Sequence, residues 1–496
     1  MRKLMILLMI ILTVLATSIQ VTAAERTDRL WQDESVYKLK VDRFMNGDTG
    51  NDVPVDPNDP DSYHGGDLQG VIDKLDYVKE LGFTAVELSP IMSNSENGYH
   101  GYWVDDFRSV EEHFGTMADA KRLVEEAHAK DMKVIFEFPV SYVSDDHPWV
   151  SDPDKASWFL GESEASTTNT WQQGLPELDT SQPDVRGYLT ETAAYWSEET
   201  GIDGFRLQTS SNVDQSLYKA LSEEVQSPEF LLFTNTLPED ELVSEGTIDG
   251  FADESYQETI RSTFKQPTDS LADLYNIYEQ NQERFSGDYQ AFHSIDDGTN
   301  QRFTHLSVVE GHNPVTRWKL ALTYLFTSPG VPVMNYGTEV PLDDGGNIGD
   351  IPMMNFKKSD EQIKQRIETL TSMRDQFPAL TRGDFQQLHN EGGLAVYQRT
   401  FQDETMLIAI NNAEKTRVTE IDTLKDDQQM RGLLQDGIVR QQSDGTYRLG
   451  MERETADVFI IEPDKGFNWL FIGFVGGVLG LFVFAVTAIS IKNRKN

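Results

Sequence analysis

The stretch that decides the fold is Gly201-Ile202-Asp203-Gly204-Phe205-Arg206-Leu207-Gln208. It follows a helical pattern over 184–199, turns at glycine, and continues as an apolar run over 204–207 with the composition of a buried strand. The same alternation of a short apolar run with a helix-period segment recurs on both sides of it. Repeated alternation of this kind predicts a parallel sheet covered by helices.

The runs expected to form strands are rich in β-branched or aromatic residues and are bounded by turn residues. They are 36–41, 84–88, 133–140, 204–207, 230–234, 306–309 and 331–334. An alternation of this length predicts an α/β fold, a (β/α)8 TIM barrel over 25–384. A doubly wound open sheet is the alternative, but no glycine-rich phosphate loop follows a strand, which weakens it.

Two regions depart from the alternation. Residues 143–182 are mostly polar and hold Trp149, Trp158 and Trp171, so we expect a small insert domain after the third strand. Residues 385–464 show short alternating strands separated by turn sequences, which predicts a C-terminal antiparallel β-sandwich.

Both ends of the chain carry membrane signals. Residues 1–24 have a basic start, an apolar run and small residues before the end, which is typical of a signal peptide. Residues 466–491 contain no charged side chain, and this length predicts a transmembrane helix. Because the tail 492–496 is basic, we expect it in the cytoplasm. The sequence thus predicts a single-pass protein of the cell membrane with an extracellular ectodomain.

Composition excludes several functions. The 496 residues carry a formal net charge of −40, which argues against binding nucleic acid through its phosphates. The chain has no cysteine, which excludes disulfides, thiolate catalysis and cysteine-ligated metals.

Several motifs resemble those of the α-amylase family of glycoside hydrolases (family thirteen). They are Tyr63-His64-Gly65-Gly66-Asp67-Leu68-Gln69-Gly70, Gly98-Tyr99-His100-Gly101-Tyr102-Trp103, Leu175-Pro176-Glu177-Leu178-Asp179, Gly201-Ile202-Asp203-Gly204-Phe205-Arg206, Pro329-Gly330-Val331-Pro332 and Tyr336-Gly337-Thr338-Glu339. The resemblance runs from about 36 to 463. It implies the barrel, the insert domain and the β-sandwich, and a retaining attack on the α-glucosidic bonds of starch-like glucans.

The resemblance also implies where the catalytic carboxylates belong. Retaining hydrolysis needs a carboxylate nucleophile and a carboxylic acid about 5–5.5 Å apart. The matching positions are Gln208 for the nucleophile and Asn235 for the acid, and the third carboxylate is expected after His312, at Asn313. All three positions hold amides, and an amide is neither a useful nucleophile nor an acid in water. The sequence therefore predicts a catalytically inactive member.

Sugar-binding positions of the family are kept. They are His100, Tyr102, Trp103, Arg206 and His312, of which Tyr102 would stack on a sugar ring. The alternative is that these residues only pack the barrel. We expect Glu137 to pair with Arg206, because a buried guanidinium needs an anionic partner.

Two loops carry hard oxygen donors. The predicted ligands are Asn46, Asp48, Asn51, Asp52, the Gly65 carbonyl and Asp67. Six such donors suit Ca²⁺, and the resemblance implies calcium at the matching positions. A solvated acidic turn is the alternative, since Asp and Asn favour turns.

Three functions stay open. The first is a non-catalytic cell-surface protein that binds α-glucan, such as a maltooligosaccharide, or a partner protein. The second is a weak or altered hydrolase of α-1,4-glucans. The third is an accessory subunit of a membrane complex, contacting a partner through the small residues Gly473, Gly476, Gly477 and Gly480.

Overall fold

The structure is a computed structural model, and it describes residues 29–52, 54–161, 170–225, 227, 229–285, 289–347, 351–464, 466 and 469–494. The predicted signal peptide, 1–24, lies outside the described residues.

Eight parallel strands close into a barrel, as the alternation predicts. They are β1 (Val36–Leu39), β2 (Ala85–Leu88), β5 (Lys133–Pro139), β6 (Gly204–Gln208), β7 (Leu231–Thr234), β8 (Gly250–Ala252), β9 (Gln290–Ser294) and β10 (Val331–Asn335). Apolar side chains from alternate positions of these strands fill the interior, among them Ile135, Phe233 and Val333. The barrel is therefore a packed core, with room for a site only at its ends.

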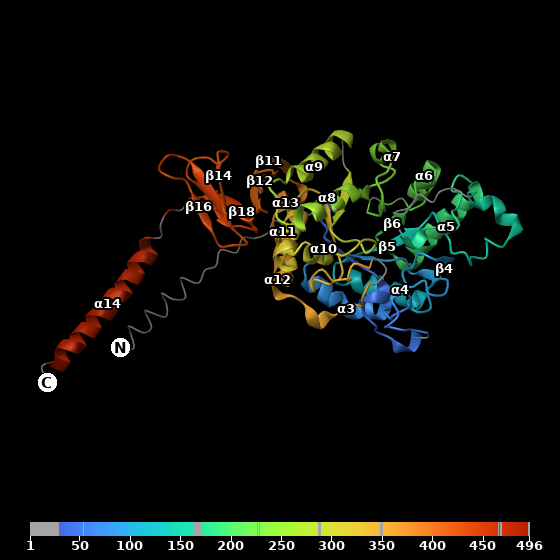
Figure 1. Cartoon of the computed structure of the whole chain (residues 1–496), viewed down its shortest axis with the longest axis horizontal. Coiled ribbons are helices and arrows are strands. Elements are labelled where there is room, and N and C mark those ends of the chain that lie inside the picture. The colour runs from blue at the N-terminus through green and yellow to red at the C-terminus, as the bar shows by residue number, and fades with distance from the viewer. Residues whose placement is uncertain are drawn as a thin grey trace.

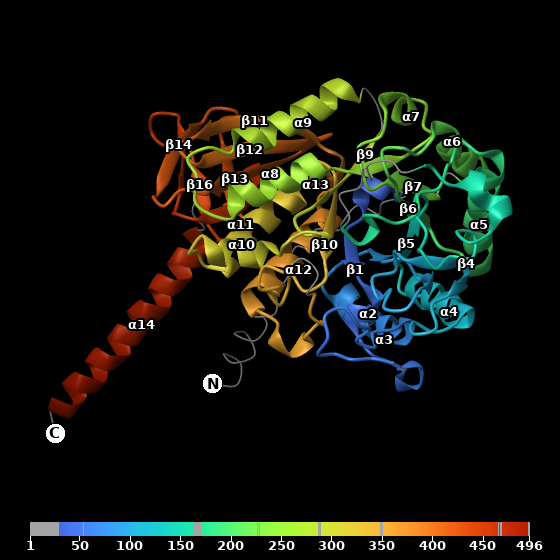
Figure 2. The same cartoon turned by 45° about the vertical axis from the view of Figure 1, so that its right-hand side comes forward.

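Helices surround this barrel (Figures 1 and 2). They are α2 (Val41–Phe44), α3 (Leu68–Glu80), α4 (Met117–His128), α5 (Pro183–Thr200), α6 (Gln215–Glu224), α7 (Asp240–Ser244), α8 (Glu254–Phe264), α9 (Ala272–Arg284), α10 (Phe303–Val309), α11 (Pro314–Thr327), α12 (Glu361–Gln376) and α13 (Pro378–Arg382). The fold-deciding stretch shows how they connect to the strands: α5 starts at Pro183 and stops at Gly201, whose φ of 74° is left-handed. This glycine turns the chain into β6.

The chain leaves the barrel twice near its carboxyl end. After β2, β3 (Met92–Asn94) and β4 (Val104–Val110) form an antiparallel pair. After β5, the third barrel strand, the segment to α5 holds the short 3₁₀ helices η3 (Pro153–Trp158) and η4 (Thr170–Gln172). This second excursion lies where the sequence places the insert.

The C-terminal β-sandwich is present as predicted. A six-stranded sheet has the order β11 (Asp384–Glu391), β12 (Leu394–Phe401), β13 (Glu404–Asn411), β18 (Thr455–Pro463), β15 (Gln428–Gly432), β16 (Ile438–Arg440). The pair β14 (Arg417–Ile421) and β17 (Tyr447–Met451) packs over it around a small apolar core of its own.

One strand prediction is wrong. Residues 306–309 belong to helix α10, and Val309 is 69% exposed there, so its β-branched run lies on a helix surface and not in the sheet. The sixth and seventh barrel strands are β8 and β9, which the sequence patterns did not reveal.

The chain ends in helix α14 (Trp469–Arg494), which extends away from the β-sandwich in both views (Figures 1 and 2). Within the described part of the chain, no helix combines the length and the apolar character needed to cross a bilayer. This finding contradicts the predicted transmembrane helix at 466–491, and with it the single-pass cell-membrane topology. Without a spanning helix, a membrane partner at Gly473, Gly476, Gly477 and Gly480 also lacks support.

Candidate active site

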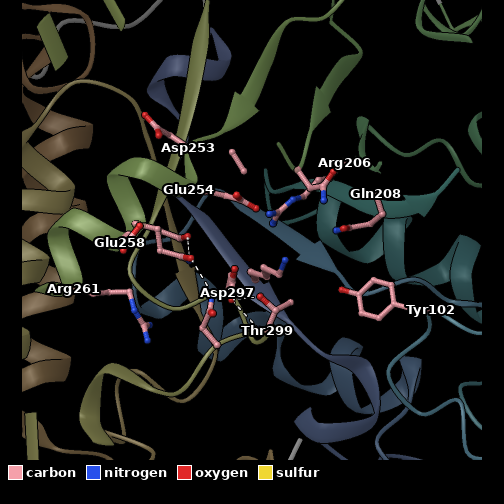
Figure 3. Close-up of a pocket in the computed structure, with 15 residues that line it drawn as sticks. Tyr102, Arg206, Gln208, Asp253, Glu254, Glu258, Arg261, Asp297 and Thr299 are labelled. Carbon is pink, nitrogen blue, oxygen red and sulfur yellow. Dashed lines mark hydrogen bonds between the residues drawn. The ribbon is translucent and has the colours of Figure 1, made fainter. Parts of the chain in front are cut away.

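A pocket of about 330 Å³ opens at the carboxyl end of the barrel (Figure 3). The side chains that line it come from the barrel strands, the loops beyond their carboxyl ends and helix α8: Lys38, Tyr102, Arg206, Gln208, Asn235, Ala252, Asp253, Glu254, Gln257, Glu258, Arg261, Ser294, Asp297, Thr299 and Asn300. In this view Arg206, Gln208 and Tyr102 lie on one side and Glu258 and Arg261 on the other, with Asp297 between them. Active sites of barrels of this type lie at this end.

Two cations and two fully buried carboxylates form the pocket floor. Lys38 Nζ lies 3.1 Å from Glu87 Oε1 and 2.5 Å from Glu137 Oε1. Arg206 Nη1 lies 2.8 Å from the same Glu87 oxygen. Glu87, rather than the predicted Glu137, thus forms the ion pair with the Arg206 guanidinium. Strand register explains the cluster, because Lys38 stands opposite Glu87 on β1 and β2, and Glu137 opposite Arg206 on β5 and β6.

Gln208 is bound to this floor. Its Nε2 donates a hydrogen bond of 2.7 Å to Glu137 Oε2, which also accepts one of 2.7 Å from the Tyr102 hydroxyl. Burial raises the pKa of Glu137, but Lys38, Arg206 and the hydrogen bond from Tyr102 outweigh burial and bring the pKa to about 2. Glu137 is therefore ionised at neutral pH, and the Gln208 amide serves as its donor.

Asn235 follows β7 and is held just as firmly. Its Oδ1 accepts hydrogen bonds of 2.8 Å from both the backbone N–H and the hydroxyl of Thr209, which follows β6. Gln208 and Asn235 therefore lie side by side at the ends of the fourth and fifth strands, as predicted, and both line the pocket.

Asp297 is the residue that the sequence missed. It follows β9, the seventh strand, and faces the pocket, accepting hydrogen bonds of 2.8 Å from the N–H and hydroxyl of Thr299. Burial alone would raise the pKa of Asp297. Lys38, the Thr299 hydrogen bonds and Arg206 lower it by more, so the net pKa lies below the usual value and Asp297 is ionised. The pair Asp296-Asp297 after Phe292-His293 was the available sequence signal.

His312 and Asn313 lie elsewhere. They connect α10 to α11, where the Asn313 Oδ1 accepts hydrogen bonds of 2.9 and 3.3 Å from the N–H groups of Val315 and Thr316. Asn313 is an exposed helix N-cap. Its predicted place as a third catalytic position is wrong, because the strand that would carry it to the pocket is a helix.

The predicted sugar-stacking ring is covered. Tyr102 is only 3% exposed, and the Trp171 ring stacks on it at 5.8 Å with an interplanar angle of 18°. His100 and Trp103 pack beside this pair and do not line the pocket. The Lys40 ammonium lies 4.3 Å from the Trp171 ring centroid, and burial lowers the Lys40 pKa to about 7. Of the five predicted sugar-binding residues, only Tyr102 and Arg206 line the pocket, and Tyr102 offers it a hydroxyl.

The predicted calcium ligands form two contacting groups, Asn46 with Asp52 and Gly65, and the Asp48 backbone with Asp67. Asn46 Nδ2 contacts both Asp52 oxygens at 2.8–2.9 Å, and Asp67 accepts hydrogen bonds from the backbone of Gly47, Asp48 and Gly70. Gly65 has a φ of 90°, and a Cβ there would come within 2.7 Å of Asn46 and Asp52. The Oδ1 atoms of Asn46 and Asn51 are buried and accept no hydrogen bond from the residues that the structure describes. Oxygens without donors are what a cation would use, so these residues fit Ca²⁺.

A second group that could hold a metal joins α10 to the loop after β10. The ligand atoms of His305, Asp343 and Asp344 lie within 4.8 Å of one another. The Asp344 carboxylate accepts hydrogen bonds from the backbone N–H groups of Arg302 and Gly346. Asp343 Oδ1 is hydrogen-bonded to His305 Nδ1. Hydrogen bonds therefore account for these side chains.

Comparison with known proteins agrees with this geometry. The family description "Alpha amylase, catalytic domain" matches residues 39–169, and "Alpha-amylase C-terminal domain" matches 383–459. An Anoxybacillus α-amylase structure is 42% identical, with a TM-score of 0.83, and covers 89% of this chain and 100% of its own.

The chain belongs to the α-amylase family. An α-amylase from Geobacillus thermoleovorans, solved in complex with acarbose, is 40% identical with a TM-score of 0.81, covering 88% of this chain and 100% of that one. The β/α-amylase of Paenibacillus polymyxa is 29% identical over 79% of this chain and 34% of its own. The chain thus spans about a third of that relative's length. The cyclomaltodextrinase of Thermoanaerobacter pseudethanolicus is 28% identical over 82% of this chain and 75% of its own.

The resemblance implies three carboxylates, and Asp297 stands where one of them is expected. Asp297 follows the seventh strand, where the third carboxylate is expected. Gln208 ends the fourth strand and Asn235 follows the fifth, and these are the two positions that the resemblance assigns to the nucleophile and the acid.

Proposed function

We propose that this α-amylase-family protein binds α-glucan chains in the carboxyl-end pocket without hydrolysing them. The observation that carries the proposal is the pair Gln208 and Asn235, amides held by hydrogen bonds at the two positions where a retaining glycosidase needs a nucleophile and an acid. Loss of one member of such a catalytic unit typically costs about 10⁴–10⁶ in rate. Asp297 alone supplies neither role.

The pocket keeps groups suited to sugar hydroxyls. Asp297 is an ionised acceptor, and Arg206 and the amides of Gln208 and Asn235 offer donors at the same opening. Relatives act on or bind glucans by their descriptions, among them the acarbose complex and the cyclomaltodextrinase. Because Trp171 covers the Tyr102 ring, binding here relies on hydrogen bonds more than on stacking at that residue.

The test is titration calorimetry of the purified full chain with maltotriose, with reducing ends measured in the same samples. We expect saturable binding and no new reducing ends. Asp297→Asn should weaken binding about tenfold, because it removes a charged acceptor. The matched control is Asp273→Asn on the exposed face of α9, which should not change affinity.

Two results would contradict the proposal. Turnover of maltotriose that Gln208→Ala abolishes would make the protein a hydrolase. Failure of the wild-type chain to bind any maltooligosaccharide would leave a protein partner as the better explanation of the pocket.

We also propose that Ca²⁺ binds between Asn46, Asp48, Asn51, Asp52, the Gly65 carbonyl and Asp67. The support is two buried oxygens, Asn46 Oδ1 and Asn51 Oδ1, that have no donor among the described residues, with the Asp52 carboxylate against the Asn46 side chain. The ion would link the loop after α2 to the start of α3, and so have a structural role away from the pocket.

A further inference from the structure

Among the described residues that line the carboxyl-end pocket, Tyr102 is the only aromatic one. Its hydroxyl reaches the pocket (Figure 3), but the residue is only 3% exposed. The face of an aromatic ring is the apolar surface against which the C–H groups of a pyranose can pack. The described part of the pocket therefore has one such surface, and that surface is covered.

The covering side chain is Trp171 of η4, which belongs to the excursion after β5 and does not itself line the pocket. Its ring lies nearly parallel to that of Tyr102, 5.8 Å away with an interplanar angle of 18°. His100 stacks against both rings, at 5.2 Å from Trp171 and 5.7 Å from Tyr102. Trp171 thus takes up the position that a flat ligand ring would occupy on Tyr102.

The indole of Trp171 can leave this position without a change in the backbone. Trp171 is half-buried, whereas the two rings beneath it are buried, so the covering ring is the one with access to solvent. Its backbone carbonyl accepts a hydrogen bond of 2.6 Å from Trp103 Nε1, and rotation about the side-chain bonds of Trp171 leaves this bond in place. The bond that closes the turn, from the Gln173 N–H to the Thr170 carbonyl, is long at 3.4 Å, beyond the usual range of about 2.7–3.2 Å. The contacts of the ring therefore contribute to holding this turn closed.

Lys40 is the cation against these rings. It is 6% exposed, and its ammonium lies 4.3 Å from the centroid of the Trp171 ring and 5.3 Å from that of Tyr102. A desolvated ammonium over an indole is among the stronger cation–π contacts, so it holds Trp171 against Tyr102. Burial lowers the Lys40 pKa to about 7. The ammonium therefore loses its charge, and with it this contact, as the pH rises through neutrality.

Charged groups of both signs face Lys40 from neighbouring elements, and they are Lys38 on β1, Arg43 on α2, Glu137 on β5 and Asp297 after β9. The pKa values of Glu137 and Asp297 lie below the usual carboxyl range, so both stay ionised. Burial holds the pKa of the adjacent His100 well below its ordinary value, so this ring stays neutral. Neither the two carboxylates nor the imidazole therefore changes charge between about pH 6 and pH 8, the range in which Lys40 does.

We propose that Trp171 is an autoinhibitory side chain, which occupies the face of Tyr102 in the closed pocket and must rotate away before a glucan ring can stack there. This inference rests on the proposed function, because it concerns how strongly the same pocket binds glucan. The Lys40 contact favours the closed arrangement below neutral pH, and its loss favours the open arrangement above neutral pH. The protein then binds glucan more tightly in mild alkali than in mild acid.

The test is calorimetric titration of the full chain with maltotriose. Trp171→Ala should tighten binding about tenfold, because it uncovers an aromatic face for the sugar. Tyr102→Leu in the Trp171→Ala background should abolish that gain, and a double-mutant cycle measures the coupling between the two changes. Trp158→Ala is the matched control. Trp158 is half-buried in the same excursion, 3.3 Å from the Lys155 ammonium, and its loss should leave the affinity unchanged.

A second measurement does not depend on whether the Trp171 variant folds. The wild-type affinity for maltotriose should rise about threefold from about pH 6 to about pH 8, as Lys40 loses its charge. Lys40→Met keeps an apolar chain beside the indole, and it should bind as tightly in mild acid as the wild type does in mild alkali. Lys121→Met is the control, because Lys121 pairs with Glu199 on the surface, and it should keep the wild-type rise.

Weaker or unchanged binding by Trp171→Ala would overturn the inference, since the indole would then be a wall of the site or irrelevant to it. A gain that survives Tyr102→Leu would overturn it too, because the uncovered face would not be that of Tyr102. A pH dependence that Lys40→Met retains would overturn the role of Lys40. Absence of maltotriose binding by both the wild type and Trp171→Ala would sink the proposed function together with this inference. Wild-type binding with no gain in the variant would sink this inference alone.

Discussion

The pocket floor and the loop pair 46–67 treat their polar groups in opposite ways. In the floor, Lys38 and Arg206 are paired with Glu87 and Glu137, and the Gln208 amide donates one of its two N–H groups to Glu137. In the loop pair, the buried side-chain carbonyl oxygens of Asn46 and Asn51 have no donor within the described part of the chain. The first region supplies its own counter-charges, whereas the second is where we propose a bound cation. An amide stands at the proposed nucleophile position where the protein pairs its charges internally, and the proposed ligand binds where it does not.

Breaking the floor should have the largest effect. Lys38→Met leaves Glu87 and Glu137 buried with Arg206 as the nearest remaining cation, and breaking a buried pair costs about 3–5 kcal/mol in the free energy of unfolding. Urea unfolding of the variant and of the wild-type chain measures this loss of stability. Lys121→Met is the matched control, because its partner Glu199 is exposed and such pairs contribute about 0–1 kcal/mol. Equal losses in the two variants would show that the floor is not a tightly coupled network.

Removing the cation from the loop pair should have the next largest effect. A ligand bound only to the native state adds about 2.7 kcal/mol at a hundred times its Kd, so a chelator should lower the melting temperature. Asn51→Ala should remove most of that difference, since its Oδ1 is one of the donor-free oxygens. Asn58→Ala, in the exposed acidic turn nearby, should leave the effect of the chelator unchanged. If the chelator leaves the melting temperature unchanged and elemental analysis finds no metal, these loops are solvated acidic turns and not a calcium site.

Restoring charge in the floor tests why the amide is there. Gln208→Glu keeps the shape but turns a donor to Glu137 into a like charge, which should cost about 1–3 kcal/mol and raise the pKa of both carboxyls. We expect no maltotriose hydrolysis, even together with Asn235→Glu. Gln215→Glu is the control, because Gln215 pairs with Glu239 on the surface. Readily measured turnover by the double variant would show that only the two carboxylates separate this protein from a hydrolase.

The sequence predicted the barrel, the β-sandwich, and the places of Gln208 and Asn235. Those two positions directly follow strands with strong apolar runs, 204–207 and 230–234. The end of each run therefore fixed which residue stands at the carboxyl end of the strand. Strands β8 and β9 were missed because Gly250–Ala252 has three residues and Gln290–Ser294 is half polar. Such strands are specified by their neighbours in the closed barrel, which local sequence does not show.

The covering of Tyr102 was also beyond sequence reasoning. Trp171 is 69 positions along the chain, and its stacking follows from the path of the excursion after β5. The ion-pair floor had a visible signal, since Lys38, Glu87 and Glu137 are charged residues inside strand patterns. A charge in a buried strand predicts a partner in the adjacent strand, and that test finds Glu87 for Lys38. It gives Glu137 for Arg206, and the contact of Arg206 with Glu87, two strands away, was not visible in the sequence.

The smallest expected effect comes from Asn313→Asp, and it decides between the two alignments of the seventh strand. If Asn313 stood in the pocket, a new carboxylate there would change sugar affinity. The structure instead makes it the exposed N-cap of α11, with Oδ1 accepting from Val315 and Thr316. Asp caps a helix as well as Asn does, so the free energy of unfolding should change by no more than about 0.5 kcal/mol. Maltotriose affinity should stay unchanged, while Asp297→Asn weakens it. An affinity change at 313 matching that at 297 would return His312 and Asn313 to the site and remove Asp297 from it.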